Sequence, residues 1–470
     1  FSLIKKTDMT TWLTIFFIIF IGLLVLASVK SYQKNRTSDE FMLAGSAIGA
    51  FLGFMTFAAA LFSAFTFMGM PDFFRNHGVG AWIFLAFSDA VMVFFIIWFG
   101  YKLRKLAKNK GFKGIAGLLE KCYQSPWAGY LFFLTALLFL IPYVAIQIRG
   151  ISIFLNAAFP DAIPSWGWSA GTVVIMLIYA EIGGLKAIVY SDAIQGILLL
   201  VVIWIIGLAC LEMSGGLGQM MANVGTQNPD LLTLPGPKGL FSTQFLIGSA
   251  IAIVMIPVTQ PQLTTRLIVM KDLKSVHKMT YAVGLFAILV ILPTAFIGLY
   301  GALKYPDVST SEFLSSALLF DQANPVAALA VVGLFAACLS TTNAQIFALG
   351  SELRSLLSGE DKTVMRYTKI SLLVFSLVVL VFSIYMSDQL VLLARLSFTG
   401  TSVMAPLVLA AVIFENPPKV LILTCGLALI GIILNILSVI PAQIAGLNFD
   451  IVLYMVHGGI SVLIMAMHKK

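Results

Sequence analysis

Thirteen apolar segments, each long enough to cross a lipid bilayer as a helix, restrict the fold of this sequence more than any other feature. A helix rises 1.5 Å per residue, so about 20 apolar residues cross the roughly 30 Å hydrocarbon core. Backbone polar groups at that depth must be bonded within the protein, which favours helices. We therefore expect an all-α polytopic membrane protein with spans at 10–29, 47–71, 79–101, 127–156, 166–184, 188–211, 240–268, 275–303, 325–353, 365–387, 389–414, 419–441 and 450–467.

The composition supports this class. Of the 470 residues, 60% are apolar and 11% are charged, whereas a soluble globular protein carries about 25% charged residues. A disordered chain and an ordinary soluble enzyme are therefore excluded. The polar intervals between spans are too short for a soluble domain, so residues 1–470 form one transmembrane domain. The four cysteines, which have no spacing typical of a disulfide or metal site, are expected to be reduced packing residues: Cys122, Cys210, Cys338 and Cys425.

The distribution of Lys and Arg among the loops predicts the orientation. Thirteen spans place the termini on opposite sides of the membrane. With the C-terminus in the cytoplasm, the cytoplasmic segments hold 22 of the 29 basic residues, seven of them between Lys102 and Lys121. We therefore expect a multi-pass protein of the plasma (inner) membrane with its N-terminus outside. Topology explains the net charge of +8, so the charge gives no reason to expect a nucleic-acid partner.

Two spans contain residues that weaken helices far from their ends. The 47–71 span has a small polar run at 63–66 followed by Gly69 and Pro71, and the 240–268 span has Pro257 and Pro261. An interior proline removes a backbone hydrogen bond, and carbonyl groups freed at membrane depth need another partner, such as an ion or a solute. The alternative is a packing kink without function. Five spans separate the pair, as expected for two inverted five-helix repeats around a binding site at the midplane.

Polar residues inside the spans are the candidate site residues. In the 325–353 span, Ala337, Ser340 and Thr341 share one helix face, so two hydroxyl oxygens could bind a hard cation, or could only bond their own helix. Buried ionisable residues usually mark function in membrane proteins. Asp89 and Arg149 are candidates for the solute cavity or a structural ion pair. Two more ionisable residues lie within the spans: Asp192, which could be only a capping residue, and Arg395.

Three motifs resemble those of the sodium:solute symporter family, which includes the pantothenate, monocarboxylate, proline and sialic acid permeases and the sodium/glucose cotransporters. The most specific is GGLKAIVYSDAIQ at 183–195, which is similar to the signature of that family. The other two are AALFSAFTFMGMP at 59–71 and AACLSTTNAQ at 336–345, the latter especially like pantothenate-type permeases. The resemblance extends over nearly the whole chain.

The resemblance implies a fold and an ion site. The fold is the leucine-transporter-like five-plus-five inverted repeat, with broken first and sixth core helices at 47–71 and 240–268. An extra helix lies at 10–29, repeat one at 47–211, repeat two at 240–414 and C-terminal helices at 419–467. The implied coupling ion is Na⁺, without any other cofactor. Its implied ligands are the carbonyl groups of three residues and the hydroxyls of two, namely Ala59, Phe62, Ala337, Ser340 and Thr341.

The resemblance also bears on stoichiometry and substrate. Family members with a second sodium site use the signature aspartate, here Asp192, and two hydroxyls that are replaced by Asn343 and Ala344. This departure favours one sodium ion per cycle. The helix aspartate of proline permeases is Leu61 here, which makes proline an unfavourable substrate. IPYVAIQIRG at 141–150 resembles monocarboxylate permeases.

These observations predict a sodium-coupled symporter that imports a small polar organic solute, carboxylate-bearing or zwitterionic, because an Arg can hold a carboxylate bidentately. A monomer would be sufficient for this function, and no residue pattern predicts an oligomer. The expected solute-lining residues are Ser63, Thr66, Asp89, Gln147, Arg149, Thr259, Gln260, Ser397 and Thr401.

Two other functions stay open at this stage. A transporter of the same fold could be driven by protons carried on Asp89 or Asp192. A solute-sensing receptor would bind its solute without net transport. An enzyme is not expected, because no metal-ligand cluster or nucleophile–base pair occurs among the spans.

Overall fold

The computed structural model describes residues 2–31, 47–160 and 162–468, and these are almost entirely helical. The long α-helices are α1 (Ser2–Ser31), α5 (Ser88–Lys110), α7 (Pro126–Ala158), α8 (Ser165–Met213), α13 (Leu273–Lys304), α15 (Asn324–Leu356) and α16 (Asp361–Tyr385). The shorter α-helices are α3 (Ala50–Leu61), α4 (Met70–His77), α6 (Ile115–Tyr123), α9 (Leu217–Gln227), α10 (Thr243–Val254), α11 (Ile256–Thr259), α12 (Pro261–Ile268), α14 (Thr310–Ser315), α17 (Leu390–Ser402), α18 (Ala405–Ile413), α19 (Val420–Ile436), α20 (Phe449–Leu453) and α21 (Gly459–His468).

Short non-α elements complete the described fold. Four of them are π-helical, η2 (Phe65–Gly69), η3 (Ile83–Phe87), η5 (Ser316–Phe320) and η6 (Tyr454–Gly458), and η4 (Pro229–Leu232) is a 3₁₀ helix. The strands β1 (Gln443–Ile444) and β2 (Leu447–Asn448) form an antiparallel hairpin, in which Gln443 lies opposite Asn448.

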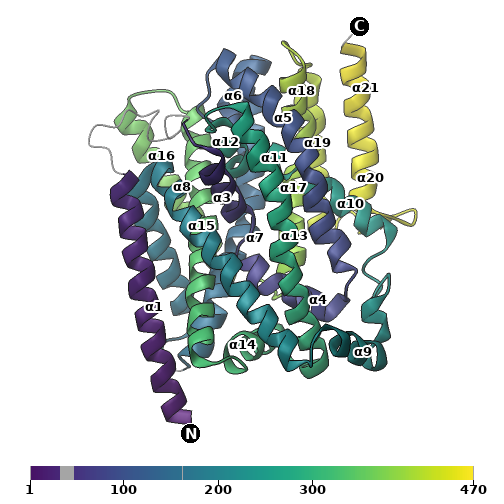
Figure 1. Cartoon of the computed structure of the whole chain (residues 1–470). Coiled ribbons are helices and arrows are strands. Elements are labelled where there is room, and N and C mark those ends of the chain that lie inside the picture. The colour runs from purple at the N-terminus through teal and green to yellow at the C-terminus, as the bar shows by residue number, and fades with distance from the viewer. Residues whose placement is uncertain (1, 32–46, 161, 469–470) are drawn as a thin grey trace.

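The long helices form a bundle, and α1 begins and α21 ends at opposite ends of it (Figure 1). α15 is the most buried of the long apolar helices and packs against α8, α7, α1 and α3. Large apolar side chains are exposed along the outer helices, including Ile18 on α1, Val381 on α16 and Leu463 on α21. Apolar side chains on the outside suit contact with the hydrocarbon core of a bilayer.

The described residues contain eight helices long and apolar enough to cross a membrane, or up to ten if each of two bent helix pairs is one span. Thirteen segments were expected. The 240–268 segment is divided among α10, α11 and α12, because Pro257 and Pro261 each stand in the first turn of a new helix. The 419–441 segment contains only α19, which ends before Ser438 adopts a positive φ of 58°.

Two further segments differ from the predicted boundaries. The expected spans 166–184 and 188–211 lie in one uninterrupted helix, α8, because no proline separates them. The expected 389–414 span is a pair of helices, α17 and α18, bent by 43°. Pro406 stands in the first turn of α18, where it cannot donate a hydrogen bond to the preceding turn.

Arg395, which lies inside the predicted 389–414 span, has a structural role. Its guanidinium donates to Ser249 Oγ on α10 (2.7 Å) and forms an ion pair with Asp450 on α20. The guanidinium also lies 4.5 Å from the ring centroid of Phe245. The ion pair and the ring contact together connect α17 with α10 and α20. All four cysteines are buried and free, as the sequence predicted.

The close approach of α13 to α4 generates a stability prediction. A Cβ added at Gly298 would lie 2.6 Å from the Pro71 carbonyl oxygen and 3.0 Å from the Arg75 nitrogen, which are backbone atoms that cannot rotate away. Gly298→Ala should therefore destabilise the fold by about 1–3 kcal/mol, measured as a lower thermal unfolding midpoint in detergent. Gly426→Ala, where the nearest atom is 4.0 Å away, is the control. Equal midpoints for the two variants would contradict this packing.

Candidate functional site

The interruption between α3 and η2 is the centre of the candidate site. α3 ends at Leu61, Phe62 is extended (φ −93°, ψ 125°), and η2 begins at Phe65. The helices on either side of the interruption are inclined by 57°. In a continuous helix Ala59 and Leu61 would accept hydrogen bonds from Ser63 and Phe65, and the interruption removes these bonds. The freed groups are buried, so each needs another partner.

Nearby side chains bond most of these freed groups. Two donors are bonded within the segment, since the Ser63 amide donates to Thr66 Oγ1 (3.2 Å) and the Phe65 amide to Ser63 Oγ (3.2 Å). Gln147 Oε1, on α7, accepts from the Ala64 amide at 3.0 Å. Tyr143, one turn earlier on α7, donates to the Leu61 carbonyl at 2.8 Å. α7 therefore fixes the shape of the interruption.

The predicted sodium ligands on α15 contact the same interruption. Ser340 Oγ donates to the Ala59 carbonyl oxygen at 3.1 Å and to that of Ala337 at 3.0 Å, and Thr341 Oγ1 donates to Ala59 at 2.9 Å. Four of the five predicted ligand atoms are thus joined in one buried cluster. Phe62 is buried beside them on the chain, and its carbonyl accepts no hydrogen bond from the described residues.

This group of atoms has the chemistry of a site for a weakly held monovalent cation. Carbonyl and hydroxyl oxygens are hard ligands, and the group contains no carboxylate that would hold the ion too strongly for release. The residues present therefore fit sodium. Among the described residues, no group of three or more His, Cys, Asp or Glu side chains could hold a metal ion.

Asp192 lies in a different, ion-paired environment. Its Oδ2 accepts from Arg266 Nη2 (3.0 Å) and from Thr56 Oγ1 (2.5 Å), while Arg266 also donates to the Thr56 carbonyl (2.9 Å) and the Gln262 carbonyl (2.7 Å). Asp192 and Arg266 are both at most 1% exposed. The sequence analysis did not name Arg266 and missed this pair. The signal was its position at the end of an apolar span.

The expected solute-lining residues of the interruption are bonded to the protein itself. The amide of Gln147 contacts both Ser63 and the Tyr143 carbonyl (each 3.1 Å), and Thr66 is fully buried. Asp89, in the first turn of α5, is 7% exposed and forms no hydrogen bond or ion pair with the described residues. The carboxyl group of Asp89 is therefore available to a ligand.

Arg149 is not paired with Asp89. Its Nε donates to Asp388 Oδ1 at 3.0 Å, in the segment between α16 and α17, and the two side chains are 25% and 29% exposed. Of the two alternatives for Arg149, the structure therefore has the ion pair, and the partner lies 239 residues further along the chain. The sequence analysis did not consider Asp388, because it lies between the predicted spans.

The expected residues of α11 and α17 are buried on elements that contact each other. Thr259 Oγ1 bonds its own helix at the Met255 carbonyl (3.0 Å), and Thr401 Oγ1 does the same at Ser397 (3.1 Å). By contrast, Ser397 Oγ and Gln260 Nε2 are buried and have no hydrogen-bond partner among the described residues. Buried polar atoms without a partner are rare, which makes these two atoms candidates for contact with a solute or water.

More unpartnered polar groups lie on α15 and α8. The side-chain amide oxygen and nitrogen of Asn343, Gln345 and Gln195 are all buried, with no hydrogen-bond partner in the part of the chain that the structure describes. Their helices α8 and α15 pack directly on each other. The sequence analysis named Asn343 only as a residue that stands in place of a hydroxyl, and it gave Gln195 and Gln345 no role. The sequence feature that could have revealed them is a side-chain amide in an apolar helix, where an unsatisfied polar group is costly.

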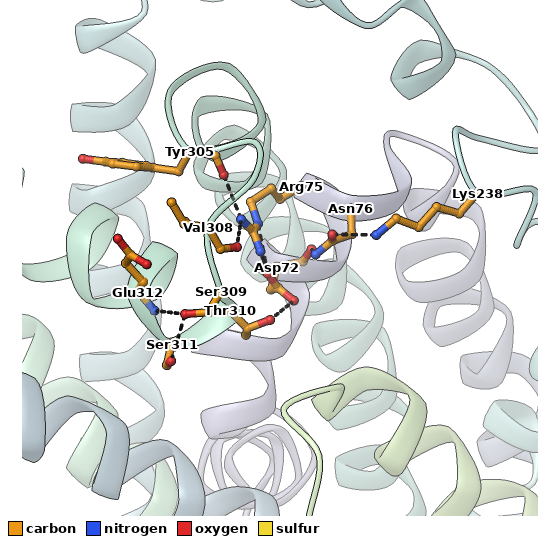
Figure 2. A network of polar contacts seen from close by, with 10 residues as sticks. All are labelled: Asp72, Arg75, Asn76, Lys238, Tyr305, Val308, Ser309, Thr310, Ser311 and Glu312. Atoms are coloured by element: carbon orange, nitrogen blue, oxygen red, sulfur yellow. Dashed lines mark hydrogen bonds and ion pairs between the residues drawn. The ribbon is translucent and has the colours of Figure 1, made fainter.

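A pocket of about 350 Å³, which we call the outer pocket, opens beside the far end of the interrupted helix. Its lining includes Gly69 of η2 and Leu390 of α17. Figure 2 shows the polar network on one wall, where Arg75 contacts Asp72 (2.8 Å) and the Tyr305 and Val308 carbonyl oxygens (2.8 and 3.0 Å). These contacts hold α4 against the segment that leads into α14.

Comparisons with known proteins find related sequences. The model of the "Sodium:solute symporter family" matches residues 41–417. The chain is 24% identical to a sodium/pantothenate symporter of Haemophilus influenzae over 71% of this chain and 69% of that protein. It is 25% identical to sodium-coupled monocarboxylate transporter 1 of Homo sapiens, over 71% and 57% respectively.

A solved structure shares the whole fold. The substrate-bound, outward-open state of a Na⁺-coupled sialic acid symporter superposes with a TM-score of 0.73 and 19% identity, covering 98% of this chain and 96% of that one. At this identity the likeness shows the fold alone.

The buried Asp192–Arg266 pair makes a testable prediction. Arg266→Gln leaves the Asp192 carboxylate buried without a counter-charge and should cost about 3–5 kcal/mol of stability, measured by thermal unfolding in detergent. In the double variant Asp192→Asn/Arg266→Gln no charge stays uncompensated, so part of the loss should be recovered. A double variant that is less stable than Arg266→Gln alone would contradict this assignment.

Proposed function

Because the chain belongs to the sodium:solute symporter family, we propose that it is a secondary active symporter that uses Na⁺ to import a small polar organic solute by alternating access. The observation that carries this proposal is the convergence of Ser340 and Thr341 on the Ala59 carbonyl at the interrupted helix. The same family resemblance, now confirmed, was stated from the sequence motifs. Its members are transporters, which argues against an enzyme.

We propose that sodium binds among Ala59, Phe62, Ala337, Ser340 and Thr341. The two hydroxyls would turn their lone pairs to the ion, which would replace the hydrogen bonds that they now donate. The ion would then join α3 to α15 and hold the interruption in one shape. Coupling by this route is reciprocal: a solute that needs this shape must also tighten sodium binding by the same factor.

One sodium ion per cycle is the proposed stoichiometry. Arg266 already supplies the positive charge that a second ion at Asp192 would supply. A cation placed there would meet the guanidinium at close range, which is unfavourable in a buried site. The replacement of two hydroxyls by Asn343 and Ala344 points the same way.

The proposed solute cavity lies between the interruption, α5, α7, α11 and α17. Ser63, Thr66 and Gln147 would form one wall, Thr259 and Gln260 a second, and Ser397 and Thr401 a third. Asp89 would bind an amine or a hydroxyl of the solute. Arg149 would bind a carboxylate by exchanging its partner Asp388, so a carboxylate-bearing or zwitterionic solute is favoured. The outer pocket, which shares η2 and α17 with this cavity, would be the route from outside.

The proposed architecture is the five-plus-five inverted repeat, with 47–211 and 240–414 as its halves. The similarity to sodium-coupled symporter structures supports it, as do the interruptions in α3–η2 and α10–α12. The N-terminus would lie outside and the C-terminus in the cytoplasm. The opposite positions of α1 and α21 in the bundle support an odd number of crossings (Figure 1).

Uptake into proteoliposomes tests this function. A labelled panel of monocarboxylates, amino acids, pantothenate, hexoses and sialic acid would be offered with an inward sodium gradient or with potassium instead. We expect one solute class to accumulate only with sodium. Ser340→Ala/Thr341→Ala removes two hydroxyl ligands, at about 1 kcal/mol each. The sodium concentration that gives half-maximal uptake should therefore rise roughly 30-fold.

The matched control removes two hydroxyls that bond only their own helix. In Thr368→Ala/Ser376→Ala, on α16, the lost bonds run to the Val364 and Leu372 carbonyl oxygens (2.9 and 2.8 Å), so transport should persist. Uptake that ignores sodium and follows a pH gradient would instead establish proton coupling, for which the unpartnered Asp89 is the candidate carrier. Tight solute binding without flux would establish a receptor.

A further inference from the structure

A second pocket, of about 580 Å³, lies at the end of the bundle opposite the outer pocket and carries a cluster of positive charges. We call it the basic pocket. Its polar side is formed by Tyr101, Arg104, Lys105 and Lys108 of α5, and its apolar side by residues that include Ile268 and Leu273. No function proposed above uses these residues.

The four polar residues occupy one face of α5, because their spacing is i, i+3, i+4 and i+7. The side chains of Lys105 and Lys108 are exposed and form no hydrogen bond or ion pair with the described residues. Two like charges one helical turn apart repel each other and destabilise a helix. An anion in the pocket would offset this repulsion.

The position of the pocket indicates the kind of anion. α5 ends an apolar segment, Ile83–Lys110, that is long enough to cross the membrane, so the pocket lies at headgroup depth. Tyr101 is 47% exposed, as is typical of an aromatic residue at a membrane interface. Phe112, Ile268 and Leu273 add apolar walls. A free phosphate has no apolar part that could contact such walls, whereas the glycerol and first acyl carbons of a lipid would contact them.

We propose that the basic pocket binds the phosphate of an anionic phospholipid headgroup. Lys105 and Lys108 would donate to the phosphate oxygens, with Tyr101 beside the glycerol. The carboxylate of Asp272, at the start of α13, attracts the guanidinium of Arg104 electrostatically. Two hydrogen bonds from Ser275 hold the pKa of the Asp272 carboxyl below its usual range. The adjacent Lys271 lowers the pKa further, and its charge offsets the carboxylate, so the pocket keeps a net positive charge.

The pocket is joined to the interrupted helices through Arg104. Its Nη1 donates to the carbonyl oxygens of Leu267 (3.0 Å), Ile268 (2.8 Å) and Met270 (2.6 Å), at the end of α12. Lys271 and Val269 in turn bond the backbone of Ile48, which precedes α3. A lipid held beside Arg104 would therefore stabilise the junction at which α12 meets the chain before α3.

Lipid binding in nanodiscs tests this proposal on the intact protein. The protein would be reconstituted with phosphatidylcholine containing a few per cent phosphatidylglycerol, and retained lipids counted by native mass spectrometry. Juxtamembrane lysines contribute about 1 kcal/mol each to anionic lipid binding, so Lys105→Gln/Lys108→Gln should weaken phosphatidylglycerol retention roughly 30-fold. The matched control, Lys110→Gln/Lys113→Gln, removes two exposed charges outside the pocket and should leave retention unchanged.

Two further measurements make the test decisive. Hydrogen exchange should show slower exchange of the 264–271 amides when phosphatidylglycerol replaces phosphatidylcholine, in wild type and not in Lys105→Gln/Lys108→Gln. Added glycerol phosphate or inorganic phosphate should not displace the lipid at millimolar concentration. Equal retention by all variants, an equal loss in the control, or displacement by free phosphate would each overturn the proposal.

Discussion

The structure depends on how a membrane protein bonds backbone groups that no longer belong to a helix. Between Leu61 and Phe65 the helix is interrupted within a buried segment, where no bulk water can satisfy the freed carbonyl and amide groups. α7 supplies Tyr143 and Gln147 to this segment, and α15 supplies Ser340 and Thr341. α15 must therefore pack closely on α3 and α7 on η2, and α15 lies at the buried centre of the bundle.

This dependence connects structure to the proposed transport cycle. The groups that complete the interruption come from two helices, so a movement of α15 relative to α3 would expose carbonyl oxygens unless an ion replaced the lost bonds. Sodium would serve this purpose with the carbonyl and hydroxyl oxygens already present. The solute cavity is proposed on the other side of the same segment, next to Gln147. One short piece of unwound backbone would thus respond to both ligands.

Local patterns in the sequence were sufficient for the nearly all-helical fold class and for the helix face that the candidate site uses. The shared face of Ala337, Ser340 and Thr341 follows from helix periodicity alone, and the meeting of Ser340 and Thr341 with Ala59 followed from the family resemblance. The partners of the charged residues could not be predicted, since Arg266 lies 74 residues from Asp192 and Arg149 lies 239 from Asp388. These pairs depend on tertiary packing. Helix boundaries failed at α8, which runs uninterrupted where two spans were expected, and at the bend near Pro406, which the expected 389–414 span did not take into account.

The most direct test of the sodium site is the thermal stability of the purified protein as a function of sodium at constant ionic strength, with potassium as the replacement. An ion that binds only the folded state stabilises it by RT ln(1 + [Na⁺]/Kd), about 2.7 kcal/mol at 100 times Kd. We predict an unfolding midpoint that rises with sodium in wild type, and a rise that needs roughly 30-fold more sodium in Ser340→Ala/Thr341→Ala. A midpoint that is the same in sodium and potassium, or a variant that responds at the same sodium concentrations as wild type, would contradict the site at the interrupted helix.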